Sequence, residues 1–412
     1  MASQQGIAPI RSDDPCAAAT LPAGTVIERI GFAASGGGYR AMLFHLGGLW
    51  RLNEFGWLTK IDHFSAVSGG ALAVGTLAAA WSRLQLSGGV ASNFRELVAE
   101  PIIAMAKVRL DVFAVIRGLL PLGSGAEALA HAYRKYLVHD ATLYELPRRP
   151  TFTFNTTNVQ TGADFRFSRK YMRDYRVGCL PYPRTPLALV LAASSSFPPF
   201  LSPCVMELPE PLGPGTEKGF DDPRFRRRLV LSDGGVYDNL GLQPLTSYRT
   251  IIASDGGSPG SIEASPRTNW LSHGQRVASI AIEEARRQRR NRLLQQLTTP
   301  TGSPDRLGTF WKIDTNAASY RAAKDGRPLF RVHDSQSRSL AAVSTRLWPS
   351  SEGTAERLIN LGYALCDASM RCFVDGVRGP DPTWPFPDSA LTSPWSSQSD
   401  RPTAGGWRRD RA

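Results

Sequence analysis

The sequence Ala33-Ala34-Ser35-Gly36-Gly37-Gly38-Tyr39-Arg40 places three consecutive glycines between two stretches of different periodicity. The preceding residues 26–32 predict a β-strand, whereas Met42, Leu46 and Leu49 recur at helical spacing. The glycines therefore stand at the N-terminus of an expected helix, where backbone N–H groups are unpaired and the helix dipole is positive. Since glycine also allows an oxygen to approach the backbone closely, this loop predicts a site for a phosphate or a developing oxyanion.

A second strand-turn-helix follows directly. Residues 63–67 predict a strand, residues 71–77 a helix, and the turn between them contains Ser68. The segment Ala66-Val67-Ser68-Gly69-Gly70 matches the nucleophile elbow G-x-S-x-G except for alanine at the first glycine position. This pattern predicts Ser68 as a nucleophile whose hydroxyl stands clear of the sheet.

A third strand, residues 229–231, leads to an aspartate on a glycine turn, Asp233-Gly234-Gly235. A serine hydroxyl needs a base within hydrogen-bonding reach, and a carboxylate can serve if burial raises its pKa toward neutrality. Asp255 also precedes two glycines, and Asp238 lies nearby. We expect two of these three aspartates to be turn or helix-cap residues and favour Asp233 as the base.

These three elements, in this order, resemble the patatin-like phospholipases, and the resemblance runs from about residue 36 to about residue 375. The segments 154–157 and 192–199 support it. It implies an α/β fold of three layers, with a central, mostly parallel sheet between helices. It also implies site roles: Ser68 as the acylated nucleophile, Asp233 as general base and later acid, Gly36, Gly37 and Gly38 as the oxyanion hole, and Arg40 binding the oxyanion or a lipid phosphate.

Two other chemistries are weighed against this one. A serine-acid-histidine triad would need His273 or His333, which follow Asp233 but carry no recognisable motif. His45 and His63 lie on the two catalytic motifs, and we expect them to be packing or polar-contact residues. Nucleotide binding is excluded because no Gly-Lys-Ser or Gly-Lys-Thr follows the glycines.

The 412 residues predict a short poorly ordered leader (1–24), one acyl hydrolase domain (25–377) and a tail rich in proline, serine and tryptophan (378–412). Within the domain, residues 93–137 predict a mostly helical insert, a candidate cap or acyl-chain pocket. No apolar stretch reaches the length of a membrane span. The tail is expected to be disordered or loosely attached.

Five scattered cysteines form no C-x-x-C pair and have no histidine companions at metal spacing. We expect reduced thiols, no metal site and no cofactor. The first 24 residues show no signal-peptide pattern, so we expect a cytoplasmic location.

The formal net charge is +12, and arginines concentrate in residues 224–228 and 284–294. Anionic lipid headgroups attract such patches, so we expect peripheral contact with a membrane surface. Nucleic acid is not expected as a partner because no aromatic-studded basic groove or recognition motif accompanies the charge.

These observations predict a serine acyl hydrolase that cleaves ester bonds of phospholipids or lysophospholipids through an acyl-enzyme intermediate. The same residues would serve a neutral-lipid esterase or an acyltransferase, because a fold does not fix its substrate. A regulated or non-catalytic membrane-binding protein is the alternative from another class. The oligomeric state is left open.

Overall fold

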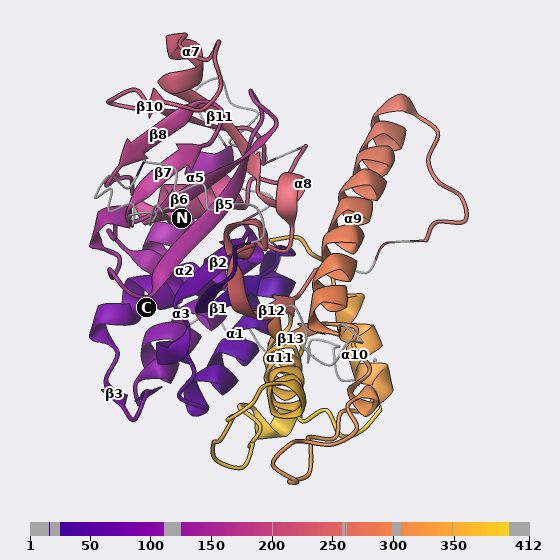
Figure 1. Cartoon of the computed structure of the whole chain (residues 1–412). Helices are drawn as coiled ribbons and strands as arrows, with labels where there is room; N and C mark the ends of the chain where they lie inside the picture. Colours follow the sequence, from indigo (N-terminus) through magenta and orange to yellow (C-terminus); the bar gives the residue numbers. More distant parts are fainter. Residues whose placement is uncertain are drawn as a thin grey trace, which may run out of the picture.

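A mixed β-sheet between helical layers forms the body of the protein (Figure 1). The computed structural model describes residue 16 and residues 25–110, 125–199, 201–257, 260, 262–298, 306–347 and 349–394. Five neighbouring strands are parallel, in the order β5 (Thr151–Asn158), β2 (His63–Val67), β1 (Ile27–Ala34), β12 (Tyr248–Asp255) and β13 (Leu307–Lys312).

Antiparallel strands extend the sheet beyond β5. On one side of β5 follow β6 (Ala163–Ser168), β7 (Tyr171–Asp174), β8 (Gly178–Pro181) and β10 (Gly213–Pro214). On the other side, β11 (Arg228–Asp233) pairs with the end of β5 and with β9 (Cys204–Glu207). The α/β layered architecture expected from the sequence is confirmed.

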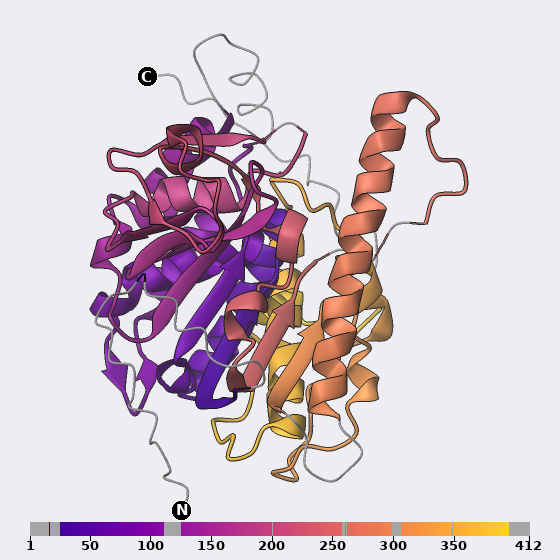
Figure 2. The same ribbon diagram turned by 45° about the horizontal axis from the view of Figure 1, so that its top comes forward.

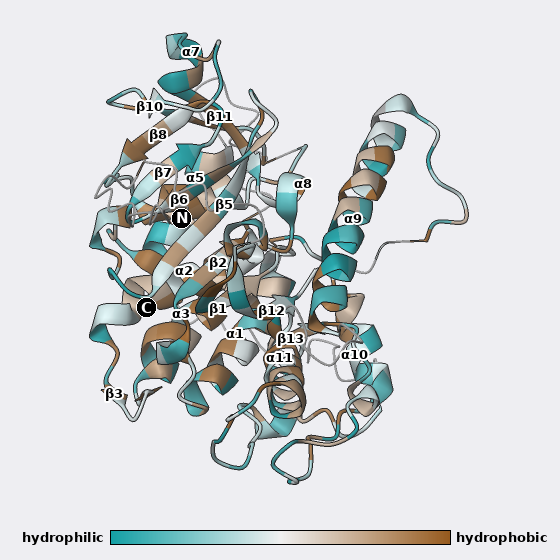
Figure 3. Ribbon diagram, viewed as in Figure 1, coloured by the Kyte–Doolittle hydropathy of each residue, from teal (hydrophilic) through white to brown (hydrophobic). Residues whose placement is uncertain are grey.

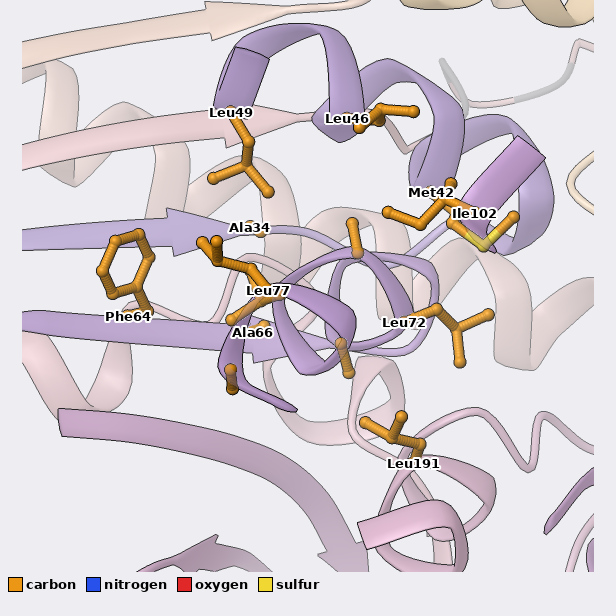
Figure 4. Packing of buried hydrophobic residues seen from close by; sticks show 14 of the residues in the cluster. Ala34, Met42, Leu46, Leu49, Phe64, Ala66, Leu72, Leu77, Ile102 and Leu191 are labelled. Carbon is orange, nitrogen blue, oxygen red and sulfur yellow. The ribbon is translucent and has the colours of Figure 1, made fainter. Parts of the chain in front are cut away.

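Helices connect the parallel strands and cover both faces of the sheet. One face carries the main core, formed with α1 (Gly38–Glu54), α2 (Gly69–Ala80), α3 (Glu100–Met105), α6 (Leu187–Ser194) and α11 (Glu352–Phe373). The alternation of side chains along a strand sends Phe32 and Ala34 into this core and Ala33 to the opposite face. There, Ala33 packs in a smaller cluster with Leu293 of α9 (Trp270–Leu297). Figure 4 shows the main core, where side chains of β1, β2 and four helices meet: Ala34, Phe64, Ala66, Met42, Leu46, Leu49, Leu72, Leu77, Ile102 and Leu191.

The expected helical insert, residues 93–137, is mostly helical in its described residues, with turns and irregular structure over residues 106–110. It contains the helical segments Arg95–Ala99, Glu100–Met105 (α3), Gly125–Tyr133 (α5) and Arg134–Val138. Val98, Ile102, Leu129 and Tyr133 are buried in the main core. Residues 111–124, which include most of the apolar stretch of this insert, lie outside the described residues.

The tail expectation is wrong for residues 378–394, which pack against α11. The side-chain amide of Asn360 donates to the carbonyl oxygens of Phe386 and Ser389 at 2.8 and 2.9 Å, and Leu391 is fully buried. Asparagine can satisfy several backbone groups at once, so it ties a segment that has no periodicity of its own. Residues 395–412 lie outside the described part of the chain.

The expectation of five reduced cysteines is wrong for two of them. Cys16 and Cys179 form a disulfide across 163 residues of sequence, with 5.7 Å between their Cα atoms. Cys204, Cys366 and Cys372 are free. The bond attaches Cys16 to β8, whereas all other residues of the expected leader (1–24) lie outside the described residues.

α1 and α11 are joined by a buried ionic contact. Arg51 of α1 donates to Asp367 of α11 at 2.7 and 2.9 Å, and Arg371 donates to the other oxygen of Asp367 at 3.1 Å. The side chains of Arg51 and Asp367 are both fully buried. The two helices also approach closely, because a Cβ on Gly362 would overlap the carbonyl oxygen of Phe44.

Replacing Asp367 by alanine is expected to lower the free energy of unfolding by about 3–5 kcal/mol, because it removes the buried carboxylate between Arg51 and Arg371 and leaves to Arg51 the ion pair with the partly exposed Glu54. Urea denaturation measures the change. The control is Asp381→Ala, which removes an exposed partner of Arg327 and is expected to cost less than about 1 kcal/mol. Equal losses in the two variants would contradict the prediction.

Candidate functional site

Ser68 lies in the sharp turn between β2 and α2, as the elbow pattern predicts. Its backbone angles are φ 51° and ψ −120°, a conformation that non-glycine residues rarely adopt and that stores strain. There is no room for a side chain at the two following positions. A Cβ on Gly69 would overlap the carbonyl oxygen of Gly38, and a Cβ on Gly70 would overlap that of Ala34. Ala66, which replaces the first glycine of the pattern, points into the main core and is fully buried, so its methyl group is accommodated there.

Asp233 is brought to Ser68 by the geometry of β5. Along one edge of β5, β2 pairs up to Val67 opposite Asn155, and β11 arrives from the other direction with Asp233 opposite Thr156. The last paired residue of β2 and the last of β11 are thus opposite consecutive residues of the same strand. Ser68 and Asp233, which are 165 positions apart in the sequence, therefore meet where the two strand ends face each other.

The carboxyl group of Asp233 is buried, and this raises its pKa from 3.8 to about 7. The hydroxyl of Ser68 hydrogen-bonds to it, and the N–H of Gly235 donates to Oδ1 at 2.6 Å; both interactions lower the pKa and thereby limit the effect of burial. A carboxyl with this pKa exists in both protonation states near neutral pH. It is suited to accept a proton from a hydroxyl and to return it.

The glycine loop lies beside Ser68, but its three glycines differ in their backbone contacts. The N–H of Gly36 donates to the carbonyl oxygen of Asn239 at 3.0 Å, so this N–H is occupied. Gly37 and Gly38 follow at the start of α1 with φ of 140° and 58°. A Cβ on Gly38 would overlap the carbonyl oxygen of Thr345, which explains why only glycine fits. N–H groups at the start of a helix have no partner within the helix, so Gly37 and Gly38 are the candidate oxyanion donors.

Arg40 is not brought to Ser68, contrary to the sequence expectation. Its guanidinium group is buried and donates to the carbonyl oxygens of Gly256, Ala341 and Val343 at distances from 2.6 to 3.3 Å. Gly256 follows β12, whereas Asp233 lies on the β5 side of Ser68. Arg40 therefore ties the start of α1 to the loop after β12 and to the segment after α10 (Asp334–Ala341).

The two rival aspartates have structural partners. Asp255 accepts two hydrogen bonds from Arg286 at 2.6 and 2.7 Å, and both side chains are buried. Burial raises the pKa of Asp255, but the charge and hydrogen bonds of Arg286, the N–H of Gly257 and the charge of Lys312 together bring this pKa below its ordinary value. Asp238 accepts the N–H groups of Leu240 and Gln243 at 3.1 and 2.9 Å, as a turn residue does.

The candidate histidines are engaged elsewhere or exposed. His45 contacts Ser254 Oγ at 2.8 Å and the carbonyl oxygen of Ser35 at 2.9 Å, and burial lowers its pKa to about 4. His63 lies between Tyr248 and Thr153, and its pKa is lowered to about 3, again mainly by burial. His333 caps the exposed start of α10, and His273 lies on an exposed part of α9. The structure thus gives no support to a triad through His273 or His333.

Sequence reasoning assigned no role to several residues that hold the site together. Ser194, at the end of α6, accepts the N–H of Ser68 at 3.0 Å and donates to the carbonyl oxygen of Asn155 at 2.8 Å. Thr157 donates to the carbonyl oxygen of Asp233 at 2.9 Å. These residues fall in the segments 154–157 and 192–199, which carry part of the resemblance to the family.

Two segments lie close to the glycine loop. The N–H of Leu110 donates to the carbonyl oxygen of Leu347 at 3.1 Å, and the hydroxyl of Tyr39 donates to the carbonyl oxygen of Val108 at 3.1 Å. The end of the described part of the insert and the segment 343–347 are thereby attached to the first turn of α1. Ser68 itself is only 7 % exposed to solvent, so the opening that leads to it is narrow.

Within the described residues, no group of three or more histidine, cysteine, aspartate or glutamate side chains is placed to hold a metal ion. In the same part of the chain, none of the helices combines the length and the apolar character that crossing a bilayer requires.

Solved structures with detectable similarity include two of the human GIVD cytosolic phospholipase A2. One is 14% identical with a TM-score of 0.47, and the other, in complex with methyl gamma-linolenyl fluorophosphonate, is 16% identical with a TM-score of 0.49. Both alignments cover 83% of this chain but only 59% and 58% of the human chains, so this chain spans less than two thirds of their length. VipD from Legionella pneumophila is 14% identical with a TM-score of 0.32, over 82% of this chain and 66% of that one. Among curated proteins, none matches the sequence.

The sequence also matches the family model of the patatin-like phospholipases over residues 32–246. This range is more than half of the 412 residues, and it contains the glycine loop, Ser68 and Asp233. The chain therefore belongs to the patatin-like phospholipase family.

Proposed function

We propose that the protein is a lipid acyl hydrolase that cleaves carboxylic ester bonds of phospholipids or lysophospholipids through Ser68 and Asp233. The observation that carries the proposal is the meeting of a strained serine with a buried carboxyl whose pKa is about 7. Membership in the family supports a lipid ester as the substrate.

In the first half of the proposed reaction, Ser68 Oγ attacks the ester carbonyl carbon while its proton passes to Asp233. The carbonyl oxygen becomes an oxyanion, which the N–H groups of Gly37 and Gly38 stabilise. As the tetrahedral intermediate collapses, the bond to the alcohol oxygen breaks, and protonated Asp233 returns the proton to that oxygen. The products are an acyl-enzyme on Ser68 and a free lysolipid or glycerophosphoryl alcohol.

In the second half, Asp233 takes a proton from a water molecule, which attacks the acyl carbonyl carbon. Collapse of the second tetrahedral intermediate breaks the bond to Ser68 Oγ, and the proton on Asp233 goes to that oxygen. A free fatty acid leaves, and Ser68 is restored. Attack by another alcohol in place of water would make the same site an acyltransferase, and a neutral lipid would follow the same steps.

The direct test measures two events with the full chain. Wild-type protein is expected to release free fatty acid from phospholipid vesicles. A fluorophosphonate probe is expected to attach to one residue, which peptide mass spectrometry identifies as Ser68. The control for labelling is Ser82→Ala, which changes an exposed serine just beyond the C-terminal end of α2 and should label as fully as wild type. A labelled residue other than Ser68, or no hydrolysis of any ester together with no labelling, would contradict the proposal.

A further inference from the structure

α9 is a helix of 28 residues that is longer than the part of the sheet it covers. Near its C-terminal end, Leu293 packs on β12 and β1, and Arg286 reaches Asp255 at the last residue of β12. The helix runs antiparallel to β12 and β13, so the residues before Arg286 extend past the carboxyl ends of the parallel strands. At 1.5 Å per residue, Trp270–Ala285 spans about 24 Å. Figures 1 and 2 both show this half of α9 standing away from the body.

The half that projects is the apolar half, which is the reverse of what solvent exposure favours. From Trp270 to Ile282 the sequence holds one charged residue, Arg276, whereas Glu283–Leu294 contains five arginines and two glutamates. In Figure 3 the projecting half of α9 combines brown turns with pale and teal ones, and a mainly teal stretch follows below it. We call the residues 262–282 the arm.

Four large apolar side chains of the arm are exposed. Trp270 is 85 % exposed, Val277 and Ile280 are each 52 % exposed, and Ile262 in the preceding loop is 99 % exposed. Trp270, Val277 and Ile280 recur at spacings of seven and three, so they lie along one side of the helix. A Cβ added to Gly274, on the same side, would have no atom within 4 Å.

The arm points in the direction in which the site opens. Ser68 and the glycine loop follow the carboxyl ends of β2 and β1, and the arm extends past the carboxyl end of β12 in the same sheet. An apolar surface here, with tryptophan at its tip and arginines behind it, fits a lipid bilayer: aromatic side chains favour the interface, and arginines favour the headgroup level. The net charge of +12 adds attraction to anionic lipid.

The two arginine-rich segments do not supply this contact by charge alone. Arg224, Arg226 and Arg228 form ion pairs with Asp222, Asp221 and Glu207. Arg286 and Arg287 form ion pairs with Asp255 and Glu284. Part of the positive charge that the sequence predicts for membrane contact is thus compensated within the fold, so an apolar anchor is needed.

We propose that the arm is a membrane-docking element: Ile262, Trp270, Val277 and Ile280 insert into the interface of an anionic bilayer and present the Ser68 edge of the sheet to it. This proposal rests on the proposed function, since it names the surface from which the lipid substrate would be drawn.

The test compares binding of the full chain to sedimented vesicles of phosphatidylcholine with phosphatidylglycerol. The variant replaces Trp270, Val277 and Ile280 by serine, and the matched control replaces three exposed apolar residues elsewhere, Val26, Leu86 and Val159, by serine. Since each inserted apolar side chain contributes a large factor to partitioning, the arm variant is expected to bind at least about tenfold more weakly, and the control as wild type. Trp270→Phe is expected to remove most of the shift in tryptophan emission on adding vesicles.

A second readout separates this proposal from the catalytic one. Hydrolysis of a short, water-soluble ester is expected to be the same in wild type and in the arm variant, whereas release from vesicles falls with binding. Vesicle binding without any ester hydrolysis in the wild type would overturn the proposed function and leave the arm intact. Equal vesicle binding of the arm variant and wild type, or a wild-type dimer that the arm variant dissociates, would overturn the arm proposal.

Discussion

Replacing Ser68 by alanine is expected to lower the rate of fatty acid release by about a millionfold, or to the background of the assay. The substitution removes Oγ, the atom proposed to form the acyl bond, and leaves the fold nearly unchanged, because alanine keeps the Cβ. Steady-state release from vesicles, with enzyme concentration raised for the variant, measures the loss. The exposed Ser82→Ala variant serves as the matched serine control and should retain wild-type activity.

The same variant has a consequence for Asp233. The hydrogen bond from Ser68 lowers the pKa of that carboxyl, so its removal is expected to raise the pKa from its wild-type value of about 7. A variant that folds as wild type and still releases fatty acid at more than a hundredth of the wild-type rate would place the nucleophile elsewhere.

Replacing Asp233 by asparagine is expected to lower kcat/KM by about ten-thousandfold. Asparagine has nearly the same shape and its amide oxygen can still accept the N–H of Gly235, but it cannot take the proton of Ser68. Asp255→Asn is the comparison, because it disturbs the ion pair with Arg286. It is expected to lower the free energy of unfolding, whereas kcat/KM of the folded protein should fall much less than in Asp233→Asn. Greater catalytic loss in Asp255→Asn than in Asp233→Asn would reverse the assignment.

The pH profile of the wild type follows from the raised pKa of Asp233. The base must be ionised, so kcat/KM is expected to rise about tenfold per pH unit below about 7 and to level off above it. The stability effect has the opposite sign. Between 3.8 and about 7 the native carboxyl holds a proton that the unfolded one has lost, so this contribution to stability is present at low pH and is lost as pH rises through about 7. Asp233→Asn is therefore expected to gain stability relative to wild type when pH is raised from about 5 to about 8.

The parts of the site that the sequence predicted are those set by local chain geometry. A strand, a serine and two glycines are enough to specify the turn at Ser68, and Gly37 and Gly38 mark the start of α1 in the same way. The preference for Asp233 over Asp255 also agrees with the contacts, since Asp255 is held by Arg286. At the two turns the deciding residues are neighbours in the sequence, whereas the contact between Asp255 and Arg286 spans 31 residues.

The parts that the sequence could not predict depend on distant partners. Arg40 donates to the carbonyl oxygens of residues 341 and 343, and the sequence around Arg40 does not indicate these distant partners. The N–H of Gly36 is taken by Asn239, and Cys179 pairs with Cys16. The composition of the tail predicted loose attachment because proline and serine show no periodicity, but Asn360 provides hydrogen bonds that require none.

β5 determines the distance between Ser68 and Asp233, because the strands that lead to both residues pair with it. Because β2 and β11 end opposite adjacent residues of β5, the register of the pairs β2–β5 and β11–β5 sets the separation of Ser68 and Asp233. If β11 shifted by two residues relative to β5, each of its side chains would still face the same side of the sheet. The carboxyl of Asp233 would nevertheless move by about 7 Å, out of reach of the hydroxyl of Ser68. Substitutions in β11 and β9 that shift this register can therefore abolish activity even where the protein still folds. The residues of these two strands are thus constrained by register as well as by packing.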